Sequence, residues 1–497
     1  MQTSVLSFRA RADVALTDPK LKLAIDRTTG TAERKRAAAL AAFPQFDAAR
    51  ERGKRIKDHV IEHFDHYLLE FERNAIASGA QVHWASTADE ASRIVVDLCR
   101  KANAKRVTRV KSMLGEEIGL PHALDAAGIE RVETDLAEHI VQLAGDRPSH
   151  IVWPSMHRTR EQVSEMFKQS HRVPHREETI EAMVDSARRE LRDKFLSADV
   201  SISGANFLIA DTGATCTVTN EGNAELTTSP PRVHIVTAGI EKLVPSLPHA
   251  FALLRLLVRS ATGADVTQYT TFHCGPKKPG DLDGPEEFHI VLVDNGRTKM
   301  LAEAGLRDML RCLRCGACMN HCVVFRQMGG HAYGGTYPGP MGAVLTPVFD
   351  GLEKSRDLPH ACTLNGKCQE VCPVDIPLPT LLRGWRDRSW REGLEPAAMR
   401  FGMGIFTFVA SRPWLYRLGT AVQVRVLGLF SRGGWIRSMP GLGAWTEHRD
   451  FPAPEGRTFM ARYASGAHAR TKAMDDGRAW ERDARHTVNE CNERQSR

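Results

Sequence analysis

Seven of the eleven cysteines in this 497-residue chain lie in two short runs, which constrain its fold more than any other feature. The first cysteine run has the spacing C-x2-C-x2-C-x3-C and contains Cys312, Cys315, Cys318 and Cys322. The second cysteine run has the same spacing with one asparagine, and contains Cys362, Asn365, Cys368 and Cys372. Three thiols at successive two-residue intervals can bind one iron–sulfur cubane, while a fourth reaches a neighbouring cluster. The runs therefore predict two clusters that carry electrons one at a time.

Zinc and disulfides explain these cysteines less well. Structural zinc sites use two separated ligand pairs, and three thiols at successive intervals overfill one tetrahedron. Disulfide frameworks are typical of short secreted chains, whereas these thiols are clustered in a long chain. The remaining cysteines are isolated, and we interpret them as ordinary thiols: Cys99, Cys216, Cys274 and Cys491.

In a two-cluster ferredoxin module, each run supplies one ligand to the other run's cluster. The first cluster, of the 4Fe-4S type, would be held by Cys312, Cys315, Cys318 and Cys372. The second would be held by Cys322, Cys362 and Cys368. Asn365 stands where its fourth thiolate is expected, so three outcomes stay open. These are a 3Fe-4S cluster, a 4Fe-4S cluster with an exchangeable corner, and a ligand from a partner subunit.

The charge and the first residues bear on partners and location. The formal net charge is +7, and no Lys/Arg-rich run with interleaved aromatic residues accompanies it, so we expect no nucleic-acid partner. We interpret Arg314 and Lys367, inside the cysteine runs, as solvated surface charges. The first residues include no apolar signal-peptide region and no twin arginine. We therefore expect a cytoplasmic protein, whose thiolates stay reduced.

The most apolar segment, residues 401–430, is too interrupted to be a transmembrane helix. The interrupting residues are Arg412, Pro413, Arg417 and Arg425. We interpret the segment as a pair of short helices packed on the cluster domain. The alternative is peripheral contact with an anionic membrane, because arginines lie among aromatic side chains.

The residues before the cysteine runs alternate between helical and strand patterns. Helices are expected up to about residue 80, and a further helix begins after the capping residue Ser86 or Thr87. Strands are predicted at 81–85, 106–111, 129–133 and 150–153, and several more between 200 and 293. This alternation predicts a layered α/β domain with a largely parallel sheet.

Polar loops follow several of these predicted strands. They are Lys111–Met113, Glu133–Asp135, Asp211–Gly213 and Thr219–Asn223. Ligands of open α/β sheets bind at the carboxyl ends of strands, so a small-molecule pocket is one interpretation. The other is helix capping and turn formation, which we adopt for each single residue because Asp, Asn, Thr and Gly favour turns. The sequence identifies no catalytic residue.

Three stretches resemble the iron–sulfur subunits of bacterial lactate-utilisation systems, the lactate utilisation protein B family. They are 133–144, 204–213 and 329–340, beside the cysteine runs, and the resemblance extends from about residue 50 to about residue 455. It implies an α/β domain related to sugar isomerases and coenzyme-A transferases, followed by an α-helical, two-cluster ferredoxin-like domain. A helical or irregular C-terminal segment specific to the family would follow.

We divide the chain on this basis into five parts. They are a helical region (1–80), an α/β lactate-utilisation domain (81–298), a ferredoxin-like domain (299–395), a family-specific segment (396–460) and a tail (461–497). The tail is rich in charged residues and poor in large apolar ones, so we expect it to be disordered.

The cysteine pattern of the family matches this chain at every position but one. The first run matches fully, and Cys368 and Cys372 match the end of the second. Asn365 stands where the family has cysteine, and Cys362 lies three residues earlier. Either Cys362 replaces the missing ligand, or the second cluster is altered.

The resemblance implies the electron-transfer subunit of a complex that oxidises L-lactate to pyruvate, supports growth on lactate and includes two other subunits. The chain would be an oxidoreductase subunit that does not itself bind substrate, with any membrane association made through its partners. One alternative is the same role for another 2-hydroxy acid, such as glycolate, or in a disulfide-reductase-like complex. Another is an α/β-domain enzyme whose clusters sense the redox state.

Overall fold

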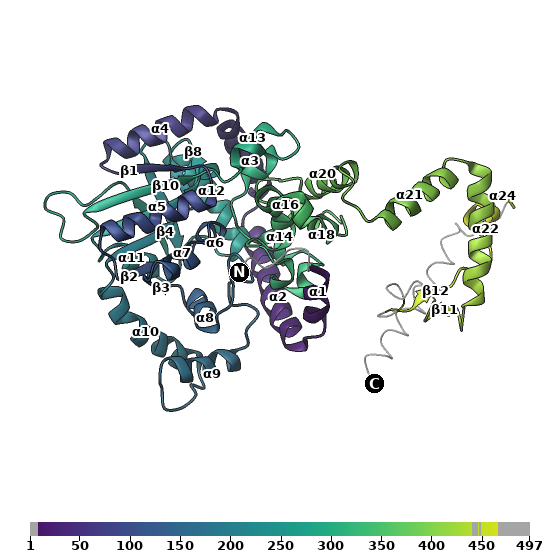
Figure 1. Cartoon of the computed structure of the whole chain (residues 1–497), viewed down its shortest axis with the longest axis horizontal. Coiled ribbons are helices and arrows are strands. Elements are labelled where there is room, and N and C mark those ends of the chain that lie inside the picture. Colours follow the sequence, from purple (N-terminus) through teal and green to yellow (C-terminus); the bar gives the residue numbers. More distant parts are fainter. Residues whose placement is uncertain (1–7, 440–445, 447–448, 466–497) are drawn as a thin grey trace. The chain divides into compact units, whose positions relative to one another are not determined.

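The computed structural model describes residues 8–439, 446 and 449–465 (Figure 1). The chain divides into two compact units, 1–394 and 395–497, each described here by itself. Most of the predicted disordered tail, with Cys491, lies outside the described residues. The part of it that is described belongs to a short helix, α24 (Phe459–Ala464), and the residue after it.

A six-stranded parallel sheet forms the centre of the first unit, in the order β1-β10-β7-β4-β2-β3. Its strands are β1 (Gln81–Ala85), β2 (Arg106–Arg109), β3 (Glu130–Glu133), β4 (Val200–Gly204), β7 (Val233–Gly239) and β10 (Glu287–Val293). Every residue of β7 is buried, as expected for a strand covered on both faces of a parallel sheet. The predicted α/β layering with a largely parallel sheet is confirmed.

A second, four-stranded sheet was not foreseen from the sequence. Its order is β8-β5-β6-β9, with β5 (Phe207–Ile209), β6 (Ala214–Thr219), β8 (Leu243–Val244) and β9 (Tyr269–His273). β6 pairs antiparallel with both β5 and β9, whereas β5 pairs parallel with β8. Because β5 begins three residues after β4 ends, this sheet starts at the carboxyl edge of the first one.

Local signals position the helices of the α/β part. Thr87 caps α5, its hydroxyl accepting a hydrogen bond from the Glu90 N–H, as the sequence predicted. The helices are α4 (Phe64–Ala77), α5 (Ala88–Lys101), α6 (Met113–Glu117), α7 (Leu120–Ala126), α8 (Leu136–Ala144), α9 (Arg160–Ser170), α10 (Ile180–Leu196), α11 (Asn223–Thr228), the 3₁₀ helix η2 (Ile240–Lys242) and α12 (Leu247–Ala261).

The predicted strand at 150–153 is wrong. These residues form a loop, because the buried His150 ring turns the backbone back on itself. Its Nδ1 accepts hydrogen bonds from the N–H groups of Val152 (3.0 Å) and Trp153 (3.1 Å). Its Nε2 lies 3.1 Å from the Asn320 side-chain oxygen, so the loop packs on the first cysteine run.

The N-terminal helices pack on the cysteine-containing segment. They are α1 (Phe8–Leu16), α2 (Pro19–Ala41) and α3 (Phe46–Glu62). The Phe8 ring meets the buried Tyr333 ring edge-on, with centroids 5.8 Å apart. α2 contacts α15 and α3 contacts η3, both elements of the cysteine-containing segment.

Short helices build the cysteine-containing segment. They are α13 (Arg297–Ala302), η3 (Arg307–Arg311), α14 (Ala317–Asn320), α15 (Phe325–Met328), η4 (His331–Tyr333), α16 (Gly339–Asp350), α17 (Leu352–Ser355), α18 (Asp357–His360), α19 (Lys367–Glu370) and α20 (Leu378–Arg391). The two runs share one backbone conformation: Gly316 (φ 75°) and Gly366 (φ 84°) are left-handed and each begins a one-turn helix. Arg314 and Leu364, two residues earlier in each run, are left-handed as well.

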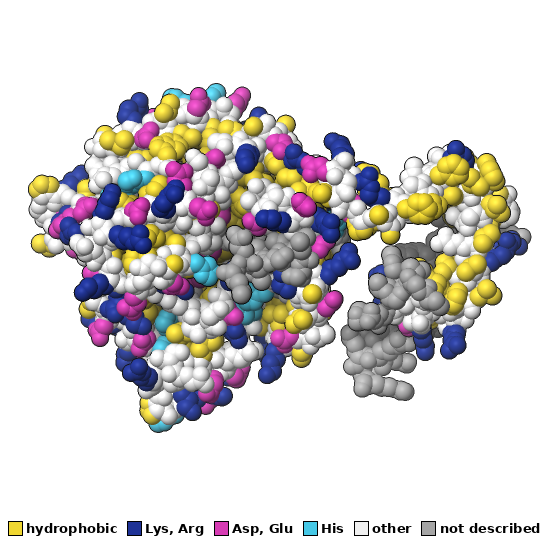
Figure 2. All heavy atoms as spheres, viewed as in Figure 1, with side chains coloured by type: hydrophobic (Ala, Val, Ile, Leu, Met, Phe, Trp, Pro, Cys, Tyr) yellow, Lys and Arg dark blue, Asp and Glu magenta, His cyan; other side chains and the backbone are white. Residues whose placement is uncertain are grey.

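The second unit contains a helical hairpin of α21 (Ala397–Ala410) and α22 (Pro413–Leu429), which contact each other. The chain breaks between them at Arg412–Pro413, as predicted. Neither helix buries a residue, and Figure 2 shows hydrophobic side chains gathered along them. Two short strands, β11 (Trp435–Ile436) and β12 (Phe451–Pro452), pair antiparallel. Among the described residues, no helix has the length and apolar character needed to cross a membrane.

Candidate metal centres and an adjoining cavity

Four cysteines from both runs surround one small cavity. Its polar lining is Cys312, Cys315, Cys318 and Cys372. Apolar side chains complete the wall, among them Leu313, Met341, Val374, Ile376 and Leu378. The structure thus brings Cys372 of the second run to the first three cysteines of the first run. Among residues 8–439, 446 and 449–465, no three His, Cys, Asp or Glu side chains converge closely enough to hold a single metal ion.

The remaining cysteines of the two runs form a second group. Burial, with the thiolates of Cys362 and Cys322, raises the pKa of the Cys368 thiol to about 12. Tyr333, 1% exposed, lies beside this group, where burial and the same two thiolates raise the pKa of its hydroxyl. The thiols of Cys322, Cys362 and Cys368 are thus near enough for their charges to interact.

Asn365 does not join this group. Its side chain is exposed, and its carboxamide oxygen accepts a hydrogen bond from the Lys367 N–H at 3.2 Å, which caps the turn that begins α19. Lys367 is also exposed and pairs with Glu370, as the sequence suggested. Position 365 therefore supplies no donor to this group of thiols in the structure.

Backbone N–H groups point at several of the sulfurs. Ile376 N–H donates to Cys372 Sγ (3.4 Å), and Leu364 N–H donates to Cys362 Sγ (3.3 Å). Burial and the neighbouring thiolates, led by that of Cys372, raise the pKa of Cys315 to about 12. Such crowded thiols become stable thiolates once iron supplies positive charge, and N–H donors to sulfur tune a cluster's potential. The residues present therefore fit iron–sulfur clusters.

The N-terminal helices hold the Cys372 loop, which sequence reasoning missed. Arg50 on α3 donates to the Cys372 carbonyl (2.7 Å) and to the Asp375 carboxylate (2.7 Å). Arg36 on α2 donates to the Val371 carbonyl at 3.1 Å. No local pattern marks these arginines, because their partners lie more than 300 residues away in the sequence.

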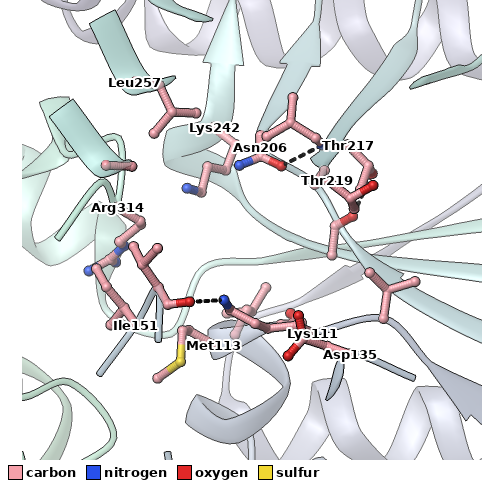
Figure 3. Close-up of a pocket in the computed structure, with 18 of the residues that line it drawn as sticks. Lys111, Met113, Asp135, Ile151, Asn206, Thr217, Thr219, Lys242, Leu257 and Arg314 are labelled. Carbon is pink, nitrogen blue, oxygen red and sulfur yellow. Dashed lines mark hydrogen bonds between the residues drawn. The ribbon is translucent and has the colours of Figure 1, made fainter. Parts of the chain in front are cut away.

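A larger cavity, of about 280 Å³, lies at the carboxyl edge of the parallel sheet (Figure 3). Three of the four polar loops singled out in the sequence contribute to its wall, whereas Asp211–Gly213 does not. Ser112 and Asp135 also cap α6 and α8, so the capping interpretation and the pocket interpretation hold for the same residues. Its polar lining includes Lys111, Ser112, Asp135, Asn206, Thr217, Thr219, Glu241, Lys242, Arg314 and Tyr337.

A buried network of ion pairs lines the side of this cavity that is next to the first cysteine run. Arg297, 1% exposed, donates to both oxygens of Glu117 (2.8 and 3.0 Å) and to Glu241. The Tyr337 hydroxyl donates to Glu117 at 2.7 Å. The Arg314 guanidinium lies over the Tyr337 ring, 4.4 Å from its centroid.

Arg314 was interpreted as a solvated surface residue, and this was wrong. Its side chain is 13% exposed and lies 3.5 Å from the Glu241 carboxylate. It is held inward by the Glu241 carboxylate and by the Tyr337 ring. The cavity and the first cysteine run therefore share this residue.

Three family models match successive parts of the chain. Residues 68–293 match the LUD domain, residues 308–376 match the 4Fe-4S dicluster domain, and residues 388–466 match the C-terminal domain of lactate utilisation protein B.

Curated relatives match over nearly their full length. An uncharacterized electron transport protein of Escherichia coli, YkgF, is 39% identical over 93% of this chain and 97% of its own. Lactate utilization protein B of Bacillus cytotoxicus is 39% identical over 93% of this chain and 98% of its own. Among solved structures, a duf162 family protein from Deinococcus radiodurans aligns with 46% of this chain and 97% of its own, with 15% identity and a TM-score of 0.27.

Proposed function

Because this chain belongs to the lactate utilisation protein B family, we propose that it is the iron–sulfur electron-transfer subunit of a complex that oxidises L-lactate to pyruvate. In this role it supports growth on lactate together with two other subunits. The observation that carries the proposal is the convergence of Cys372 with Cys312, Cys315 and Cys318 on one cavity. A chain that gathers four thiols from two runs in this way is built to hold a redox cluster.

The ligand sets follow from the two groups of thiols. Cys312, Cys315, Cys318 and Cys372 would hold a 4Fe-4S cluster, and Cys322, Cys362 and Cys368 would hold a second cluster. Since Asn365 faces solvent, the second cluster would be 3Fe-4S, a 4Fe-4S cluster with one exchangeable corner, or a 4Fe-4S cluster whose fourth ligand comes from a partner subunit. Bound clusters supply one-electron transfer, which suits an oxidation that releases two electrons.

The protein's own groups would tune these clusters. The N–H donors to Cys372 and Cys362 stabilise negative charge on sulfur. Arg36 and Arg50 place positive charge beside the Cys372 loop and favour the reduced state of the first cluster. Apolar side chains around the first site exclude water. The nearby arginines and N–H donors therefore act strongly on the reduction potential of the first cluster.

We further propose that the α/β part is related to the sugar-isomerase and coenzyme-A-transferase fold. This rests on the sequence resemblance and agrees with the parallel sheet and its crossover helices. We also propose the boundaries of the five parts that were predicted from the sequence.

The α21–α22 hairpin is proposed to bind the partner subunits. Residues 397–439 contain six arginines and no acidic residue, lysine or histidine, and the exposed side chains of the hairpin include Phe401, Phe406, Trp414 and Leu429. An apolar partner surface rimmed by carboxylates would complement this hairpin. Replacing Phe401 and Phe406 with serine should abolish co-purification with the partner subunits. Retained co-purification, with loss of binding to anionic vesicles instead, would show that the hairpin contacts a membrane.

The experiment that tests the function is reduction of the clusters by substrate. The complete complex, assembled anaerobically, should lose visible cluster absorbance when L-lactate is added, and the Cys372→Ala complex should lose less. Cys99→Ala, which replaces a buried thiol in the α/β part, should behave as the unmodified complex. Bleaching by glycolate but not by L-lactate would assign another 2-hydroxy acid, and no bleaching by either would reject the function.

A further inference from the structure

We propose that the 280 Å³ cavity at the carboxyl edge of the parallel sheet binds the carboxylate of a small organic acid beside the first cysteine run. The narrower assignment to a 2-hydroxy or 2-oxo acid rests on the proposed function. The proposal that the cavity binds an organic acid replaces the expectation that this chain binds no substrate. Four lines of observation support it: a cationic end, a polar wall, a shared boundary with the first cluster site, and the cavity's position.

Position is the first observation. The cavity lies where the loops after β2, β3, β4 and β7 meet, at the carboxyl ends of parallel strands. Small molecules bind open α/β sheets at this edge. Lys242 reaches the cavity from η2, directly after β7, whereas Arg314 reaches it from the first cysteine run.

The cationic end is formed by Lys242 and Arg314. Burial lowers the pKa of Lys242 to about 8, yet its side chain lines the open space of the cavity. Nη1 of Arg314 is buried and has no hydrogen-bond partner among the described residues. A bound carboxylate would favour protonated Lys242 and could accept a hydrogen bond from Arg314, both as charge-assisted contacts.

The charges around this end do not balance among themselves. Four cations, Lys57, Lys242, Arg297 and Arg314, surround two carboxylates, Glu117 and Glu241. Lys57 is already engaged, since it donates to the carbonyls of Glu241 (2.6 Å) and Leu243 (3.1 Å). The thiolates of the first cluster site add negative charge at this end, because Cys312 raises the pKa of Lys242.

A neutral polar wall faces the cavity from the second sheet. The Asn206 carboxamide oxygen accepts a hydrogen bond from Val218 N–H (3.1 Å), and Figure 3 shows its amide nitrogen turned away from that bond. The Thr217 hydroxyl donates to the Gly204 carbonyl (3.1 Å), which leaves its oxygen able to accept. This wall provides a donor and an acceptor for a hydroxyl or oxo group next to the carboxylate.

The cavity and the first cluster site share a boundary. Arg314 stands between Cys312 and Cys315, and Val152 lines the cavity while packing on Gly316. A Cβ at Gly316 would lie 3.2 Å from the Val152 side chain. An acid in the cavity would therefore place negative charge beside the first cluster and lower its reduction potential.

The test is calorimetric titration of the anaerobically purified full-length protein, with its clusters, against four probes. L-lactate and pyruvate should bind with one site per chain, whereas lactamide, which lacks the carboxylate charge, should not bind. Lys242→Met should weaken binding at least tenfold, and Lys242→Arg should retain most of it. Lys299→Met, at an exposed lysine on α13 outside the cavity, should change nothing. Inorganic phosphate is the fourth probe, and its binding in place of the acids would overturn the assignment to carboxylates.

A second measurement needs no variant and covers the case in which Lys242→Met misfolds. L-lactate should slow acylation of Lys242 in the unmodified protein, followed by mass spectrometry, and leave Lys299 unaffected. Equal acylation rates with and without L-lactate, or unchanged affinity in a folded Lys242→Met variant, would overturn the proposal. Binding without cluster bleaching in the complex would reject the electron-transfer function alone. Bleaching without binding to this chain would reject the cavity alone.

Discussion

Replacing Arg297 with methionine should destabilise the first unit far more than removing an exposed arginine. Arg297 is 1% exposed, and its carboxylate partners Glu117 and Glu241 are 2% and 4% exposed. Loss of one partner from a buried ion network leaves uncompensated charge and costs about 3–5 kcal/mol. With an unfolding entropy of about 2.1 cal/mol/K per residue over residues 1–394, this lowers the melting temperature by about 4–6 °C.

Thermal unfolding followed by circular dichroism, under anaerobic conditions, measures this effect. Arg189→Met is the matched control, because its pair with Asp185 is 65% and 51% exposed and such pairs contribute about 0–1 kcal/mol. Burial raises the pKa of Glu117, but Arg297 more than offsets this and lowers it. The carboxylate therefore stabilises the fold above pH 4.5 and less as the pH falls, so the deficit of the variant should shrink in acid. A loss no larger than that of Arg189→Met would show that the buried network does not stabilise the first unit.

Three further predictions concern separate features. Gly330→Ala should cost about 1–3 kcal/mol or more, because its Cβ would lie 1.8 Å from the Ser149 carbonyl oxygen, while Gly305→Ala meets nothing within 4 Å and should leave urea unfolding unchanged. Asn365→Cys should supply the missing thiolate and make the second cluster resist iron loss in air, measured by iron content over time; equal loss would place residue 365 outside the site. Burial and His171 lower the pKa of His139 from 6.5 to about 4, so this group should remove about 3 kcal/mol of stability as the pH falls from 6.5 to 4. His139→Phe should make the loss of stability between pH 6.5 and 4 smaller, although other buried histidines such as His157 and His273 still contribute to it; an unchanged profile would contradict the assignment.

The sequence predicted the parts of the fold that depend on local patterns. The strand at 81–85 and the Thr87 cap follow from alternation and capping chemistry within a few residues, and both are present. The loop at 150–153 was mistaken for a strand because its apolar residues carry the same pattern. Its backbone is instead set by His150, whose position depends on Asn320, 170 residues away.

The candidate site divides in the same way. The spacing within each cysteine run is local and marks a two-cluster ferredoxin pattern, in which the runs exchange ligands, so the grouping of Cys372 with the first run could be expected before any coordinates. The network of Glu117, Glu241 and Arg297 joins residues 56 to 180 positions apart, and no sequence pattern marks it. Lys242 could have been noticed, because it closely follows the fully buried strand β7, at the edge where ligands bind.

The presence of two clusters can be measured by an iron and acid-labile sulfide count on the anaerobically purified protein, with electron paramagnetic resonance before and after dithionite. We expect seven or eight irons per chain: about seven with a three-iron signal in the oxidised protein, or about eight with interacting signals only after reduction. Either count would show that both groups of thiols hold a cluster. About four irons would mean a single working cluster, and zinc in place of iron would contradict electron transfer altogether.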